Sequence, residues 1–63
     1  MKEFVAKGSR QLDICVRMLF ANGMKIHLIP KKDEKEHVYY VLAARMSDRK
    51  YEELMELYKT LIK

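Results

Sequence analysis

The sequence predicts an α+β fold for residues 1–63: a two-layer β-α-β-β-α sandwich whose three-stranded sheet, of order 1-3-2, carries two helices on one face. Hydrophobic residues make up 49% of the 63-residue chain, which is enough for one small core and a single domain. Apolar residues alternate in three short segments and recur with a period of about 3.6 residues in two longer ones. The order of these segments along the chain is β-α-β-β-α.

A change of period separates the first strand from the first helix. Residues Lys2–Lys7 alternate between apolar and polar, which is typical of a short strand. After the break at Gly8, we expect the hydroxyl of Ser9 to cap a helix over Arg10–Asn22, with Gly23 ending it. The core side of the strand carries Phe4 and Ala6. The apolar stripe of the helix consists of Leu12, Cys15, Val16, Leu19 and Phe20.

The second and third strands are predicted to form a hairpin. Met24–Ile29 alternates, and Pro30 is expected to end it because proline cannot donate to a strand ladder. The charged run Lys31–Glu36 is typical of a loop. His37–Ala44 is rich in Val and Tyr and is apolar on both faces, which favours a central strand.

The last helix is predicted over residues 48–62, with Ser47 or Asp48 as its cap. Its apolar positions recur at helical spacing. They are Tyr51, Leu54, Met55, Tyr58, Leu61 and Ile62.

Connection rules convert this order into a topology. A right-handed crossover joins the first two strands, the hairpin makes the third antiparallel to the second, and the two-sided third strand lies in the middle. The arrangement resembles the ferredoxin-like β-α-β-β-α-β pattern without its last strand. This resemblance is one of topology and implies no function. It implies an open edge on the first strand, and open edges recruit other chains.

The sheet face away from the helices is the surface most suited to a partner, because it is half apolar and half basic. A symmetric hairpin would place His27 and His37 nearly opposite each other on this face. The residues that we expect to form a partner or nucleic-acid surface are Lys7, Lys25, His27, His37, Tyr39, Val41 and Arg45.

Residue types that carry catalysis are sparse, so we expect no enzyme, no cofactor and no metal site. Cys15 is the only cysteine and falls on the apolar stripe, where it packs as a small hydrophobe. His27 and His37 lack a third ligand nearby. Ser9 and Ser47 both occupy positions expected for helix caps.

Composition and charge suggest two functions. The leading hypothesis is a non-catalytic protein-interaction or regulatory module that acts as a homodimer, through the sheet edge or face, or docks on a larger protein. The net charge of +4 and a pI of about 9.3 support an alternative, a small basic nucleic-acid-binding protein that uses Tyr39 on the open face. No apolar run is long enough to span a bilayer, no secretory h-region is visible, and a lone thiol suits a reducing compartment, so we expect a cytoplasmic protein without membrane contact.

Overall fold

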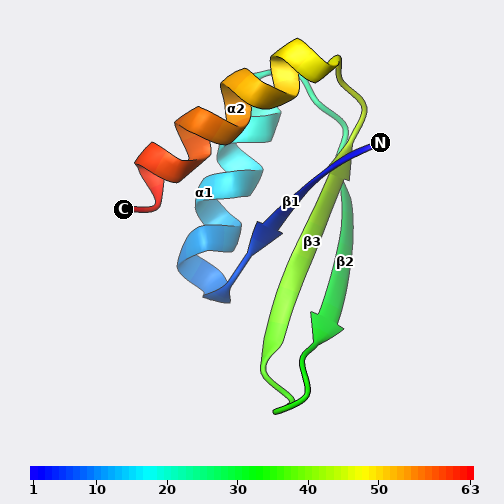
Figure 1. Ribbon diagram of the computed structural model, residues 1–63, viewed down its shortest axis with the longest axis vertical. Helices are drawn as coiled ribbons and strands as arrows, with labels where there is room; N and C mark the ends of the chain where they lie inside the picture. Colours follow the sequence, from blue (N-terminus) through cyan, green and yellow to red (C-terminus); the bar gives the residue numbers. More distant parts are fainter.

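The computed structural model describes residues 1–63 and confirms the predicted class and strand order. Both strand pairs are antiparallel, in the order β1-β3-β2. Both helices lie on the same side of the sheet, and the β2–β3 hairpin extends beyond them (Figure 1). The elements are β1 (Lys2–Ala6), α1 (Gly8–Ala21), β2 (His27–Lys32), β3 (Val38–Ala44) and α2 (Asp48–Leu61).

The core lies between the helices and the β1–β3 part of the sheet. Phe4 is fully buried, and its ring meets Tyr51 and Tyr58 of α2 edge to face, with centroid separations of 5.2 and 6.0 Å. Leu19 of α1 and Leu42 of β3 complete the centre of the same cluster. The alternation of β1 and the helical stripes therefore point to the residues that are buried.

Two stripe positions differ from the prediction. Phe20 is 62% exposed and Leu61 is 44% exposed, although both match the helical spacing. The buried residues of α1 are Cys15 and Leu19, both on the predicted stripe, and Met18 beside them. A stripe predicted from spacing alone is wider than the surface that the small sheet can cover.

Helix α1 begins before the predicted cap. Lys7 is the N-cap residue and Ser9 lies inside the first turn, so the predicted Ser9 cap is wrong. Gly8 adopts a φ of +84°, which glycine allows, and this turns the chain into the helix two residues earlier than predicted. The side-chain oxygen of Gln11 accepts from the Lys7 N–H at 2.9 Å and satisfies a group at the helix start.

The end of α1 is as predicted, at Asn22–Gly23. Gly23 has a φ of +72° and its N–H donates to the Phe20 carbonyl, while the Met24 N–H donates to the Leu19 carbonyl. This pair of bonds is the Schellman arrangement that satisfies the last carbonyls of a helix.

The position of β2 corrects the prediction. The strand begins at His27 and passes through Pro30 to Lys32, whereas Met24–Ile29 was expected. Pro30 lies opposite Tyr40 on an edge strand, where a nitrogen facing away from β3 costs no ladder bond. Residues 24–26 are needed to bring the chain from the helix layer to the sheet, so they precede the strand.

The hairpin register also separates the two histidines. His27 pairs with Ala43, and the ladder ends at Lys32 opposite Val38. His37 lies in the loop at the other end of the hairpin, so the expected His27–His37 proximity is wrong. The loop is short because Asp33 Oδ1 accepts from the N–H groups of Lys35 and His37, both at 2.9 Å.

Candidate functional site

The open sheet face carries an apolar row at its centre. Val5, Val41 and Ile29 are in register across β1, β3 and β2. Val41 is only 7% exposed because its neighbours flank it, whereas Val5 and Ile29 are 46% and 42% exposed. No helix covers this face, so the three side chains form a small apolar surface that is open to a partner.

A basic and aromatic row lies on the hairpin side of the apolar row. Tyr39 pairs with Lys31 in the ladder. Lys7 follows Ala6, which pairs with Tyr40, so Lys7 lies beside Tyr39 on the other flank. Both lysines are exposed and Tyr39 is half-buried. Two cations therefore flank one aromatic ring on the open face.

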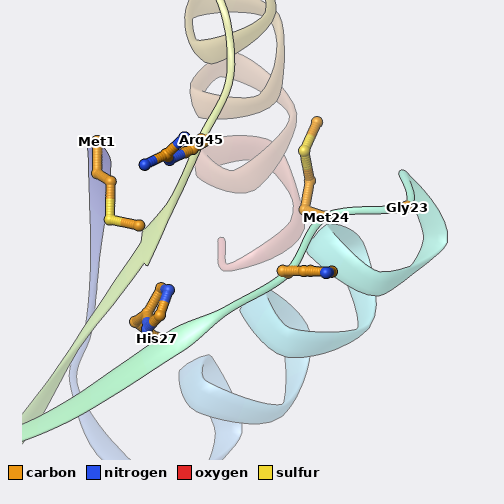
Figure 2. A pocket seen from close by; sticks show the side chains of 6 residues that line it. Met1, Gly23, Met24, His27 and Arg45 are labelled. Atoms are coloured by element: carbon orange, nitrogen blue, oxygen red, sulfur yellow. The ribbon is translucent and has the colours of Figure 1, made fainter.

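A basic hollow lies at the opposite end of the same face (Figure 2). The ladder ends at the His27–Ala43 pair, beyond which the chain before β2 and the chain after β3 diverge. Met1 and Arg45 lie near His27, with Met24 and Gly23 across the gap (Figure 2). The hollow has a volume of about 540 Å³ and is lined by Met1, Gly23, Met24, Lys25, His27 and Arg45.

The positive charge of the molecule is concentrated on this face. It carries four cations, Lys7, Lys25, Lys31 and Arg45, and one carboxylate, that of Glu3. Its formal charge is therefore +3 with His27 neutral, against +4 for the chain. None of the four cations is in an ion pair.

Of the nine cations elsewhere, four are paired with carboxylates. Lys2 pairs with Asp48, and their hydrogen bond raises the pKa of the Lys2 amine and lowers the pKa of the Asp48 carboxyl. The other cations paired with carboxylates are Arg17, Arg49 and Lys59. The open face differs from the rest in net charge, because its four cations are balanced by one carboxylate, whereas nine cations and eight carboxylates lie elsewhere.

Six of the seven residues predicted for the site share the open face. The seventh, His37, lies in the hairpin loop with its Nδ1 3.6 Å from Asp33 Oδ2, and it lines a hollow of about 260 Å³ together with Lys7 and Tyr39. Lys31 was missed because it was assigned to the loop. Continuing the strand alternation through Pro30 would have found it, since an edge strand accepts a proline.

Neither sheet edge is a simple template for another strand. The Tyr51 and Tyr58 hydroxyls of α2 donate to the Glu3 and Val5 carbonyls of β1, both at 2.8 Å. The Asp33 N–H donates to the His37 carbonyl at 3.1 Å, so by alternation the Pro30 nitrogen faces away from β3. The same alternation directs the Glu3 and Val5 carbonyls to the free side of β1. On the other edge Pro30 offers no N–H, and two lysines follow it.

The remaining reactive groups are inert or isolated. Cys15 is buried, and burial raises the pKa of its thiol to about 11, so the nucleophilic thiolate is scarce at neutral pH. No three or more His, Cys, Asp and Glu side chains gather closely enough to hold a metal ion. Neither helix has the length and apolar character needed to cross a bilayer.

Comparison with known proteins adds no relative: no family model, curated protein or solved structure matches the chain.

Proposed function

We propose that this chain is a small non-catalytic interaction module that docks its open sheet face onto an acidic segment of a partner protein. The observation that carries the proposal is the apolar row of Val5, Val41 and Ile29, with unpaired cations at both of its ends. Apolar contact supplies affinity, and the flanking charges select the partner and speed its association.

The charge of the face favours a partner of another kind over a second copy. In a two-fold dimer the same surface meets itself. Two faces of formal charge +3 would then be desolvated against each other, which is repulsive. Strand pairing is hindered at β1 by the tyrosine hydroxyls and at β2 by Pro30. An acidic partner avoids all of these costs.

Synthetic peptides test this directly. One set would carry two or three large apolar residues flanked by Asp and Glu, and a matched set would replace the acids with Lys. Binding would be followed by chemical shifts of the backbone amides. We expect only the acidic set to bind, with shifts centred on Val5, Val41 and Ile29, and with affinity falling as salt rises. Equal binding of both sets, or shifts centred on the helices, would contradict the proposal.

Near-isosteric variants then separate the apolar row from the charges. Val5→Thr and Ile29→Thr keep β-branched side chains at exposed strand positions, so the fold should survive while the apolar surface is lost. We expect each to weaken binding of the acidic peptide several-fold, by about 1 kcal/mol. Leu57→Gln is the control, because Leu57 is a similarly exposed apolar residue on α2.

A second candidate function, single-stranded nucleic-acid binding, is favoured by the Lys7–Tyr39–Lys31 row. Lysines would contact phosphates while Tyr39 stacks on a base, worth about 1–3 kcal/mol per base. Short single-stranded and duplex oligonucleotides near 50 mM salt provide the test. Tyr39→Ala should weaken single-strand binding without unfolding the domain, whereas Tyr40→Ala, on the helix side, should mainly destabilise it. Lys25→Glu should weaken binding to every sequence alike. Binding that is insensitive to Tyr39 would contradict this candidate.

A further inference from the structure

The hollow between the diverging ends of β2 and β3 combines features that are found together nowhere else on the molecule. Lys25, His27 and Arg45 line it, and no carboxylate does. Neither Lys25 nor Arg45 is in an ion pair or donates a side-chain hydrogen bond within the chain, so their donors are free for a ligand. The two methionines in the lining add an apolar wall.

This donor set matches a tetrahedral oxyanion. The planar Arg45 guanidinium presents a fork of N–H donors that suits two oxygens of one phosphate, and Lys25 adds a mobile point charge. The imidazole of His27 supplies a further N–H donor in either charge state. A volume of about 540 Å³ also leaves room for a group attached to the phosphate.

The C-terminal end of α1 would repel an anion in the hollow, but backbone hydrogen bonds reduce this repulsion. Gly23 places the C-terminal end of α1 at the hollow, and a helix C-terminus carries partial negative charge. The carbonyls of Leu19 and Phe20 are, however, already bonded to the N–H groups of Met24 and Gly23. Their partial charge is therefore partly compensated before a ligand arrives.

We infer that this hollow is a binding site for the terminal phosphate group of a phosphate ester, held by Arg45, Lys25 and His27. The inference goes beyond the proposed docking of a protein and does not rest on it. The site uses the charged end of the open face, whereas the docking surface is centred on the apolar row two residues further along the strands.

Glu3 provides a sensitive internal probe of the inference. It pairs with Ala43, which in turn pairs with His27, so its carboxylate belongs to the row next to the hollow. A negative charge at this place should weaken anion binding without touching the ligand. Replacing Glu3 by Gln should therefore strengthen phosphate binding, an effect that no loss of folding would imitate.

The first experiment uses inorganic phosphate alone, exchanged for chloride at constant ionic strength and neutral pH, with amide chemical shifts as the readout. We expect saturable shifts at Gly23, Lys25, His27 and Arg45. Arg45→Gln should weaken binding by about tenfold, as expected for loss of a charge-assisted pair. The affinity of Arg45→Lys for phosphate should lie between those of the unchanged protein and Arg45→Gln. Glu3→Gln should tighten binding by about twofold. Lys32→Gln, which removes an exposed, unpaired cation from the opposite side of β2, is the matched control.

The second experiment identifies the source of the phosphate. A nucleoside 5′-monophosphate, a phosphoserine peptide and a 5′-phosphorylated oligonucleotide are each compared with the same molecule lacking the phosphate. Tighter binding of any phosphorylated member at the hollow supports the inference, and the tightest one names the ligand class. Non-saturating shifts spread over all lysines, equal loss in Arg45→Gln and Lys32→Gln, or equal binding of phosphorylated and unphosphorylated forms would overturn it. The first experiment contains no peptide, so its outcome is independent of the proposed docking function, and the phosphoserine peptide is judged only by shifts at the hollow.

Discussion

Two tyrosine hydroxyls link α2 to the backbone of β1. Tyr58 is 3% exposed, its ring packs edge to face on Phe4, and its hydroxyl donates to the Val5 carbonyl at 2.8 Å. Tyr51, two turns earlier on α2, also packs its ring edge to face on Phe4, and its hydroxyl donates to the Glu3 carbonyl. Each ring therefore serves the core while its hydroxyl satisfies a carbonyl of an edge strand.

Replacing Tyr58 by Phe tests the hydrogen bond alone, because the ring and its contact with Phe4 remain. We expect the free energy of unfolding to fall by about 1 kcal/mol, the usual net value of such a bond plus the cost of a poorly solvated carbonyl. Urea unfolding at neutral pH measures the change. An unchanged midpoint would show that water replaces the hydroxyl.

The same residue predicts an alkaline transition. Burial, with a smaller effect of Cys15, raises the pKa of Tyr58 from 10.0 to about 12. The folded state thus holds this proton more tightly than the unfolded state. The resulting stabilisation is complete below pH 10 and is lost as pH rises through 12. Tyr58→Phe, which has no proton to lose, should show a shallower decline over this range in unfolding monitored by circular dichroism.

Neighbouring residues on α1 provide a matched test of the core. Leu19 is fully buried and Phe20 is 62% exposed, although both lie on the predicted stripe. We expect Leu19→Ala to cost about 2–5 kcal/mol. That loss is comparable to the whole stability of a small domain, about 5 kcal/mol, so much of the population should unfold. Phe20→Ala should change the thermal midpoint little. Similar losses for the two variants would mean that Phe20 is covered in solution.

At the scale of elements, the two helices begin by different means. In α2 the Ser47 hydroxyl accepts from the Lys50 N–H at 3.1 Å, and Asp48 adds a negative charge in the first turn. In α1 a glycine with positive φ and the side chain of Gln11 replace a hydroxyl cap. Both serines appear equally suitable in the sequence, yet only one acts as a cap.

This difference predicts unequal effects of the same substitution. Ser47→Ala should reduce the free energy of unfolding by about 1 kcal/mol because an orphan first-turn N–H loses its acceptor. Ser9→Ala, inside the first turn of α1 and without a side-chain bond, should be nearly neutral, since alanine is the better helix former. Chemical denaturation of the two variants side by side decides the point, and equal losses would contradict the assignment of the Lys7 cap.

At the scale of the whole molecule, charge is segregated between two faces. The open sheet face carries four unpaired cations, while the helix side holds most of the ion pairs. A face-to-face dimer would concentrate like charge. We therefore expect the protein to sediment as a 7.6 kDa monomer at high micromolar concentration and low salt. A two-fold larger mass would restore the homodimer suggested by composition and would redirect the search for a partner.

Much of this architecture follows from local patterns. The alternation of Lys2–Lys7, the stripe around Leu19 and the two-sided His37–Ala44 segment predict the elements, the core and the central strand, because burial selects apolar residues at the period of each element. The open face could be predicted for the same reason: alternation assigns Tyr39 and Val41 to the side opposite Tyr40 and Leu42.

Three features were decided only by the tertiary structure. The register of the hairpin depends on how Asp33 closes the loop, and it separates His27 from His37. The passage of β2 through Pro30 depends on the strand lying at an edge, which brings Lys31 onto the face. The hollow at Arg45 depends on where the segment before β2 and the segment after β3 diverge beyond the end of the ladder. The sequence by itself determined which residues are apolar and at what period, and hence which side of each element is buried. Register, edge position and divergence arise from contacts between segments far apart in the chain, and no local pattern records them.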